Sequence, residues 1–322
     1  MNRMKVFLFM LACCWLFWLF PSPFSLNITV RDDDGHPVSG ATVSGSFYRD
    51  RVFMGIKSPF HRGETDENGF VRLYGSDNLY VDVWARKDGY YDTTHQVLVR
   101  GGVPDQVQVL LRKKHNPIAM HARHANITLP EYNREFGYDL LKGDLVMPGR
   151  NGVNTDIILR VDRWTPRPEE LGAELTIRFP HQMDGQVPME LKDVWGTSDF
   201  KTAYAAPEDG YAGILQASFK DRLGPGPGSR FGAEGHYEKI NINKPFFMRI
   251  RSGTDENGRM LANYCKVAPG VNIHRWGRTS PMPTVVMRHY CNPVPNDRNV
   301  EFDIRRNLIK RPKEDTYAVN EP

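Results

Sequence analysis

The sequence lacks the motifs by which most catalytic sites are recognised. It contains neither the Gly-x-Ser-x-Gly elbow of serine hydrolases nor the His-Glu-x-x-His pattern of zinc proteases. Its few cysteines lie in no catalytic cysteine signature. Carboxylates are plentiful, but a sequence does not say which of them share a cleft. No catalytic residue, cofactor or metal site is therefore predicted, and a non-enzymatic protein is favoured.

An excess of charge of one sign is also missing. Lys and Arg number 42 and Asp and Glu 38, a formal net charge of +4. The only charged residues among 1–25 are Arg3 and Lys5. Without these two, the 42 basic residues become 40, against 38 acidic residues. This balance gives no reason to expect a nucleic-acid partner. Glu314 and Asp315 directly follow a basic stretch, and residues 313–322 are expected to form a flexible, solvated tail.

Long helical patterns are the third absence. No window longer than ten residues places apolar side chains at helical spacing, and only 168–171 could start a short helix. Pro (23) and Gly (28) are spread through the chain as turn residues, which is typical of many short strands. The predicted fold is mainly β. An Ig-like or prealbumin-like β-sandwich is followed by a second β-rich domain with few or short helices.

The first 25 residues have the pattern of an export segment. Met1–Lys5 carries two positive charges, Val6–Phe20 is an unbroken apolar run of 15 residues, and Pro21–Pro23 ends it. The run is shorter than the roughly 20 residues that span a bilayer, which favours a secretory signal. Small residues are missing at position −3 of the possible cleavage sites, so an uncleaved membrane anchor stays open, with lipidation at Cys13 ranked third.

These alternatives agree that the protein is exported. It is expected to be periplasmic or extracellular, or else anchored in a membrane and facing away from the cytoplasm. Contact with the membrane is expected only through the N-terminal segment, and only where that segment is retained.

Residues 26–112 are predicted to form the first domain. Leu26–Val30, Leu79–Ala85 and Gln106–Leu111 alternate apolar and polar side chains, as half-buried strands do. Turns rich in Asp, Asn and Gly separate the strands at 32–35 and 65–69, because these residues tolerate left-handed backbone angles. Short strands at this spacing predict a sandwich. The aspartates at 32–34 are interpreted as a turn, since the spacing of a calcium loop is absent.

Three motifs of this domain occur in an order that resembles the carboxypeptidase regulatory-like family. They are Val30…Asp34-Gly35-x-Pro37-Val38-x-Gly40-Ala41-x-Val43, Thr65-Asp66-x-Asn68-Gly69-x-Val71, and Gly89-Tyr90. The resemblance implies a transthyretin-like β-sandwich in an extracytoplasmic setting. It also implies an accessory module rather than a catalytic one, and function does not follow from the fold alone.

The second predicted domain covers residues 113–312 and begins at the charged, turn-prone Lys113–Pro117. Its strand-like segments are 125–129, 155–161, 174–179, 246–252, 261–267 and 285–290. Further motifs, over residues 113–309, resemble a group of uncharacterised exported bacterial proteins and imply no known activity. They are Gly137-Tyr138-Asp139-Leu140, Lys142-Gly143-Asp144, Ala206–Tyr211 and Asn292–Asp303.

Cys265 and Cys291 are the only cysteines beyond the export segment. Each lies in a strand-like segment, and two thiols in an exported protein are more often joined than reactive. A disulfide between neighbouring strands would close a loop of about 25 residues and stabilise the fold by roughly 3 kcal/mol. The alternative is two buried free thiols that pack as small apolar residues.

The motif at 292–303 and five aromatic residues are candidate binding features. The motif is interpreted as a structural buttress in which Arg298 pairs with Glu301 or Asp303, and alternatively as a loop in which Arg298 binds a carboxylate or sugar oxygen. Its candidate residues are Asn292, Asn296, Asp297, Arg298, Asn299 and Glu301. The aromatic residues either stack on a ligand or belong to the core, which is favoured. They are Trp164, Trp195, Tyr204, Tyr211 and Trp276.

Three histidines, His115, His121 and His124, lie close together after the predicted domain boundary. They are interpreted as solvated residues of an exposed linker, because no cysteine or paired His motif accompanies them as in a metal site.

The features together predict a non-catalytic component of the cell envelope or extracellular space. Its expected partners are a carbohydrate, a cell-wall polymer or another envelope protein. The alternative is an extracytoplasmic hydrolase with its site in residues 113–312. A purely structural envelope component, held by an uncleaved anchor, is a third possibility.

Overall fold

The structure, a computed structural model, describes residues 23–48, 60–76, 80–98, 106–164, 170–191, 198–222, 241–242, 244–274, 282–310, 319 and 322. These residues form twenty strands and no helix, so the predicted mainly β fold class is confirmed. The short helix expected from residue 168 is not observed in the described part, because Leu171 lies inside a strand. Trp195, Trp276 and almost all of the export segment lie outside the described residues.

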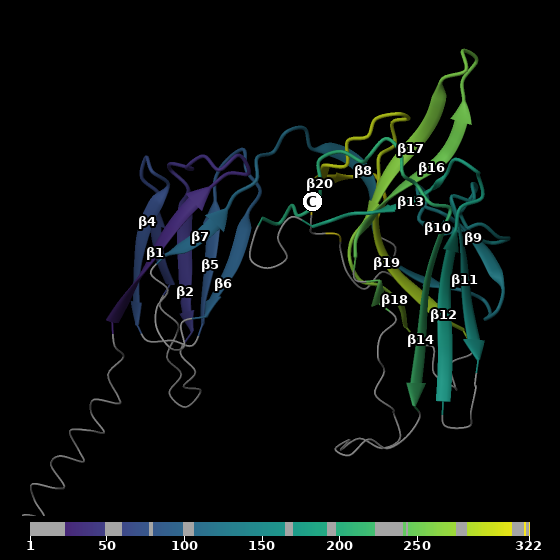
Figure 1. The fold of residues 1–322 in the computed structure, drawn as a ribbon, viewed down its shortest axis with the longest axis horizontal. Helices are drawn as coiled ribbons and strands as arrows, with labels where there is room; N and C mark the ends of the chain where they lie inside the picture. Colours follow the sequence, from purple (N-terminus) through teal and green to yellow (C-terminus); the bar gives the residue numbers. More distant parts are fainter. Residues whose placement is uncertain are drawn as a thin grey trace, which may run out of the picture. The chain divides into compact units, whose positions relative to one another are not determined.

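The chain divides into two compact units, drawn in Figure 1. Unit 1 contains residues 1–114 and 193–201, and unit 2 contains residues 115–192 and 202–322. Among the described residues, no helix is long and apolar enough to cross a membrane. Of the predicted flexible tail, only Val319 and Pro322 are described, and Val319 packs against a hydrophobic core of unit 2 rather than lying in solvent.

Unit 1 is a β-sandwich of two sheets. One sheet has the order β4-β1-β7 and the other β3-β2-β5-β6. Its strands are β1 (Pro23–Arg31), β2 (Thr42–Tyr48), β3 (Phe60–Glu64), β4 (Phe70–Ser76), β5 (Tyr80–Arg86), β6 (Thr93–Leu98) and β7 (Val107–Leu110). The alternation expected for half-buried strands is observed, since Leu26, Ile28 and Val30 of β1 face Val81 and Val83 of β5 in one core. Strand β1 begins at Pro23, so it includes the last three residues of the predicted export segment.

The motif at 65–69 forms the β3–β4 turn and ties it to the neighbouring chain. The hydroxyl of Thr65 donates to the Val38 carbonyl (2.6 Å) and accepts from the Ala41 N–H (2.8 Å). Gly69 has φ +72°, and a Cβ there would lie 2.4 Å from the Val30 carbonyl oxygen, so only glycine fits. The turn at 32–36 is held by Asp32, which accepts from the Asp34 and His36 N–H groups and pairs with Lys113 at 2.8 Å.

A segment distant in sequence completes unit 1. Phe200 is fully buried, stacks on Tyr91 at 4.8 Å and lies under the Arg112 guanidinium at 4.8 Å. Arg112 Nη1 donates to the Phe200 carbonyl (3.1 Å), and the Asp199 N–H donates to the Asp92 carbonyl (2.7 Å). The first sandwich therefore includes residues beyond those predicted for it.

Unit 2 is built from a five-stranded sheet, β10-β9-β11-β12-β14, and an eight-stranded sheet. The larger sheet has the path β13-β16-β17-β19-β18-β15, with β8 paired to β19 and β20 paired in parallel to β8. The strands of the smaller sheet are β9 (Glu135–Asp139), β10 (Asp144–Leu145), β11 (Ile157–Trp164), β12 (Glu170–Arg178) and β14 (Ile214–Arg222). Those of the larger sheet are β8 (Ile118–Thr128), β13 (Gly185–Pro188), β15 (Asn241–Ile242), β16 (Phe246–Thr254), β17 (Met260–Val267), β18 (Val271–His274), β19 (Thr284–Cys291) and β20 (Phe302–Asn307).

The larger sheet is buried on both faces. One face packs against the smaller sheet in a core that contains Val285 and Met287 of β19. The opposite face carries a second core, in which Tyr290 and Phe302 pack with Ala206 and other residues from irregular segments. Burial of both faces explains why most positions of β19 are buried, without the alternation of a half-exposed strand.

The predicted disulfide between Cys265 and Cys291 is confirmed. The two residues are directly opposite in the β17–β19 pair and both are fully buried. On the other side of β19, Cys291 lies opposite His121 of β8.

Candidate functional site

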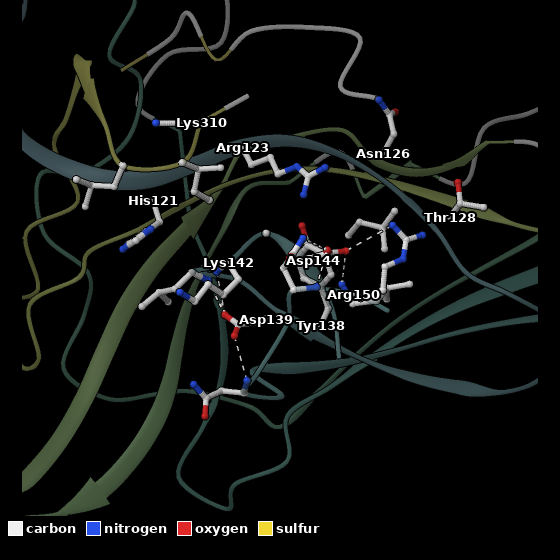
Figure 2. Close-up of a pocket in the computed structure, with 18 of the residues that line it drawn as sticks. His121, Arg123, Asn126, Thr128, Tyr138, Asp139, Lys142, Asp144, Arg150 and Lys310 are labelled. Carbon is white, nitrogen blue, oxygen red and sulfur yellow. Dashed lines mark hydrogen bonds and ion pairs between the residues drawn. The ribbon is translucent and has the colours of Figure 1, made fainter. Parts of the chain in front are cut away.

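A cavity of about 740 Å³ opens in unit 2 beside β8. Four stretches of sequence line it: β8, residues 138–154, the β16 residue Arg251, and residues 308–310. On β8, His121 and Arg123 lie on the face that carries Ala125 and Ile127 into the main core. The inner face of the sandwich thus changes from apolar to polar at the cavity, which Figure 2 shows in close-up.

Asp139 organises the wall of the cavity. It is fully buried at the end of β9, and its Oδ1 accepts from the Leu141 and Lys142 N–H groups at 3.1 and 2.9 Å. Its Oδ2 accepts from the Val153 and Asn154 N–H groups, both at 3.0 Å. One carboxylate therefore holds the β9–β10 turn and the loop before β11 in place.

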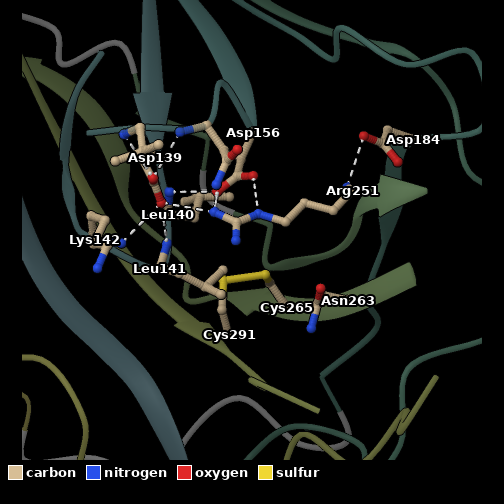
Figure 3. Close-up of polar contacts among 12 residues, drawn as sticks. Asp139, Leu140, Leu141, Lys142, Asp156, Asp184, Arg251, Asn263, Cys265 and Cys291 are labelled. Atoms are coloured by element: carbon tan, nitrogen blue, oxygen red, sulfur yellow. Dashed lines mark hydrogen bonds and ion pairs between the residues drawn. A yellow bond between two sulfur atoms is a disulfide. The ribbon is translucent and has the colours of Figure 1, made fainter. Parts of the chain in front are cut away.

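Arg251 joins this wall to the larger sheet (Figure 3). Its Nη2 donates to Asp139 Oδ1 (2.9 Å), and its Nε donates to Asp156 Oδ1 (2.7 Å). Arg251 lies in a β-bulge of β16 with φ 55°, an uncommon backbone conformation for a residue with a side chain. The buried Asp184 holds this conformation, because its carboxylate accepts from the Arg251 and Ser252 N–H groups at 3.0 and 2.8 Å.

The two buried aspartates differ in their electrostatics. Burial opposes ionisation of Asp139, but its backbone N–H donors and the Arg251 charge outweigh burial and lower its pKa. Burial is the dominant influence on Asp156 and raises its pKa, although Arg251 acts in the opposite direction. Burial would lower the pKa of Arg251, but both carboxylates reverse that effect and raise it, so Arg251 stays charged.

His121 and Tyr138 line the cavity, and a second histidine, His289, lies behind Tyr138. His289 is fully buried, and its Nε2 is 3.5 Å from the hydroxyl of Tyr138, which lines the cavity. Burial, with the charges of Arg123 and His121, lowers the pKa of His289 to about 3. The pKa of His121 is lowered by burial and then by Arg251 and Lys142, with Asp139 acting against them. Both imidazoles are therefore neutral at pH 7.

Cationic side chains surround the opening, as Figure 2 shows for Arg123, Lys142, Arg150 and Lys310. Arg150 lies 3.7 Å from Asp144, which also accepts from the N–H and side-chain amide of Asn151 at 3.0 and 3.1 Å. Gly143, with φ +67°, lets Arg123 lie against the turn, since a Cβ would stand 2.8 Å from Arg123 Cδ. Residues 137–144 are indicated by the sequence only as a family motif, and no local pattern predicts that they form a site.

The polar motif at 292–303 makes the contacts of a buttress. The Asn292 side chain donates to the carbonyls of Asp297 and Asn299 at 3.0 and 2.9 Å, and the Asn296 side chain accepts from the Ala262 N–H at 3.0 Å. Glu301 accepts from the N–H groups of His115 and Asn116 at 2.9 and 2.6 Å.

Arg298 makes a contact that the sequence did not predict. Its Nη1 donates to the Ala206 carbonyl (3.3 Å), whereas Asp303, one of its expected partners, pairs with Arg305 at 3.2 Å. Arg298 and its neighbours also line a shallow hollow of about 380 Å³, so the alternative of a binding loop stays a prediction.

The three described aromatic candidates each contact protein groups. Trp164 lies opposite Gly172 in the β11–β12 pair, and a Cβ on Gly172 would meet its ring at 2.3 Å. Tyr204 stacks on the exposed His115 with ring centres 4.0 Å apart. Tyr211 donates to the Pro207 carbonyl (2.8 Å) and lies under Arg249 at 4.6 Å, and burial raises its pKa. Ligand stacking on these rings stays a prediction.

The interpretation of the three histidines as residues of a solvated linker is wrong for two of them. His121 and His124 belong to β8 and are half-buried, and only His115 is exposed. The charged and polar side chains on β8 concealed the strand, because they stand at positions where an apolar inner face was expected.

Comparison with known proteins shows no family for this chain. No family model and no curated protein match it. Catechol 1,2-dioxygenase from Acinetobacter radioresistens is 14% identical with a TM-score of 0.26, over 30% of this chain and 53% of its own. 3-Chlorocatechol 1,2-dioxygenase from Rhodococcus opacus 1CP is 13% identical with a TM-score of 0.25, and the match covers 30% of this chain and 61% of the dioxygenase.

The chain thus spans about half to three-fifths of the length of these dioxygenases. BcpA, the major pilin subunit of Bacillus cereus, is 10% identical, with a TM-score of 0.22 over 83% of this chain and 95% of its own. These low scores carry no argument about function. The class that the structure defines is a mainly β protein whose first unit is a β-sandwich.

Proposed function

We propose that this chain is an exported, non-catalytic binding protein of the cell envelope or extracellular space, and that unit 2 binds a polar ligand in the cavity beside β8. One observation carries the proposal. The inner face of a sandwich is normally apolar, but here it becomes polar around a cavity of about 740 Å³ whose walls are fixed by buried hydrogen bonds.

The lining suits a ligand rich in hydroxyl groups, such as a carbohydrate or cell-wall polymer. Asn126, Asn151 and Asn154 place side-chain amides in the lining, and Thr128 places a hydroxyl there. The Asn151 amide also donates to Asp144 (3.1 Å), and the Thr128 hydroxyl pairs with that of Thr284 (3.1 Å). Because Asp139 and Arg251 fix the β9–β10 turn and the following loop, Asn154 is held before a ligand arrives, and Asn126 and Thr128 are held by strand β8, which lowers the cost of ordering these groups.

The contacts of the lining carboxylates support binding over hydrolysis. A general acid or base needs an oxygen within reach of the substrate. Both oxygens of Asp139 already accept hydrogen bonds from backbone N–H groups, and Asp144 accepts from Leu145 and Asn151 and forms an ion pair with Arg150 at 3.7 Å. Asp139 is also fully buried, and a hydrolase would have to release one of its contacts in order to use this carboxylate.

The disulfide and the sequence motifs support export. A bond between two fully buried cysteines is typical of proteins that fold in an oxidising compartment. The motifs of residues 26–112 resemble an accessory module, the carboxypeptidase regulatory-like domain, with its setting outside the cytoplasm. Contact with a membrane, where it exists, is assigned to the segment before Pro23.

The test is a screen of the purified full chain against glycans and cell-wall polymers, followed by calorimetric titration of any hit. Asn126→Ala in the cavity should weaken binding, whereas the matched Asn299→Ala beside the shallow hollow should leave it unchanged. Hydrolysis of a polymer without stable binding would support the alternative hydrolase. Binding that responds to Asn299→Ala instead would move the site to the polar motif.

A further inference from the structure

We propose that the ligand presents an anionic oxygen group, a carboxylate, sulfate or phosphate, to the cationic rim of this cavity. The inference rests on the proposed function and specifies its ligand as an acidic polymer rather than a neutral one. Arg123, Lys142, Arg150, Arg251 and Lys310 line the cavity, against the carboxylates of Asp139 and Asp144.

The charges deeper in the cavity are already balanced. Arg251 contacts Asp139 and Asp156 at 2.7 to 3.0 Å, so its charge is matched by buried carboxylates. At the opening, Arg150 forms an ion pair with Asp144 at 3.7 Å. Their charges therefore maintain the wall of the cavity and add little to an outward field.

Lys142 and Lys310 supply the remaining positive charge. Both are exposed at the rim, and neither forms an ion pair within the part of the chain that the structure describes. Both line the cavity together with Arg123, whose stem packs on Gly143, and Figure 2 labels all three. An anion placed between these ammonium and guanidinium groups would receive charge-assisted hydrogen bonds, which are the stronger kind.

The two neutral histidines agree with a positive cavity. Burial is the main cause of the lowered pKa of His121 and of His289, and Arg251 and Lys142 add to it at His121, as Arg123 does at His289. The cations that oppose protonation of these imidazoles also favour an incoming anion. His121 would then offer a neutral N–H donor or acceptor beside the bound group.

The experiment compares matched ligands by titration of the full chain at low salt. The probes are an oligogalacturonate, its neutral methyl ester, a sulfated oligosaccharide, a glycerol phosphate oligomer and inorganic phosphate. At least one acidic oligomer should bind about tenfold or more tightly than the neutral ester, and its affinity should fall as salt is raised. The preferred acid identifies carboxylate, sulfate or phosphate as the group that is bound.

Variants locate the effect. Lys142→Ala and Lys310→Ala should each weaken the acidic oligomer about threefold to tenfold. Lys244→Ala is the control, because this lysine is exposed in the same unit but does not line the cavity. Circular dichroism of each variant verifies folding. All three substitutions are at exposed positions, so loss of fold is not expected.

The outcomes separate the two proposals. One outcome is that the oligogalacturonate and its ester bind equally well, and that this binding is lost in Asn126→Ala but unchanged in Lys142→Ala. That result would overturn the proposal of an anionic ligand and leave the proposed function standing. Binding of inorganic phosphate alone, weakened by Lys142→Ala, would support the anion site and refute polymer binding. The proposal of an anionic ligand would also be overturned if no probe bound. It would be overturned as well if Lys142→Ala and Lys310→Ala lost no more affinity than Lys244→Ala.

Discussion

Arg251 is the residue on which the cavity wall depends most. Its guanidinium contacts Asp139 and Asp156, which are almost completely inaccessible to solvent, and its backbone is held by Asp184. Removing one partner of a buried ion pair leaves the other charge without compensation. The positive φ of Arg251 also shows that the bulge has a conformational cost which these contacts offset.

Arg251→Ala is therefore predicted to lower the free energy of unfolding of unit 2 by about 3–5 kcal/mol. The matched control is Arg259→Ala, an exposed arginine of the β16–β17 hairpin, with an expected change of less than about 0.5 kcal/mol. Urea unfolding measures both. Equal effects of the two substitutions would show that the charge network contributes little to stability.

His289 makes stability depend on pH. Its pKa of about 3 in the folded state lies below the ordinary value of 6.5, so the unfolded chain takes up the proton first as pH falls. This contribution to stability is complete above pH 6.5 and is lost progressively down to about pH 3. By pH 5 the loss amounts to about 2 kcal/mol.

His289→Gln is predicted to make the free energy of unfolding less dependent on pH between 7.5 and 5, by about 2 kcal/mol over that interval. Groups shared by the two proteins cancel in the comparison, among them Asp156, whose raised pKa acts with the opposite sign. His36→Gln, at an exposed histidine, serves as the control. Parallel pH profiles for wild type and His289→Gln would contradict the prediction.

Residue patterns predicted the turns of this protein better than its site. Gly69 and Thr65 occupy the turn that their motif indicated, because local backbone angles and hydrogen bonds decide that structure. Arg251, Asp139 and Asp156 come from distant parts of the chain and meet only through sheet pairing. No local pattern contains that information, and a positive φ at an arginine has no signal in the sequence.

At the scale of elements, alternation identified the strands with one apolar face. β5 and β7 of unit 1 show the expected alternation of buried and exposed residues. β8 was recognised only in part, because His121 and Arg123 carry polarity onto its inner face at the cavity. The same feature that makes the site also removed the hydrophobic pattern by which the strand would have been found.

The segment around Phe200 is an element of unit 1 that no pattern predicted. Its ring fills a site formed by Tyr91 and Arg112, and Ser198 pairs with Thr93 of β6. Phe200→Ala should therefore lower the free energy of unfolding of unit 1 by about 3–5 kcal/mol, the usual cost of removing a buried aromatic side chain.

The control for Phe200→Ala is Tyr74→Ala. Tyr74 is an aromatic residue of the same unit, and it is 61% exposed. Hydrogen exchange of peptides from β5 and β7 should report faster opening for Phe200→Ala and little change for Tyr74→Ala. Unchanged exchange in both would mean that the sandwich does not require this segment.

At the scale of the whole molecule, the chain contains separate hydrophobic cores. The core of unit 1 is built from residues 26–111, and both cores of unit 2 are built from residues beyond 117. A domain with its own core can unfold as its own cooperative unit. A change that is confined to one core should therefore affect one transition and not the other.

Reduction of the disulfide provides the test of that separation. Refolding in reductant should lower the free energy of unfolding of unit 2 by roughly 3 kcal/mol, since Cys265 and Cys291 are 26 residues apart and cross-link neighbouring strands. Unit 1 should keep its stability in reductant. Phe200→Ala should instead destabilise unit 1 and leave unit 2 unchanged. The double variant Cys265→Ala/Cys291→Ala should not respond to reductant. Differential scanning calorimetry with peptide-resolved hydrogen exchange can follow both units, and an equal shift of both in reductant would show that they unfold as one.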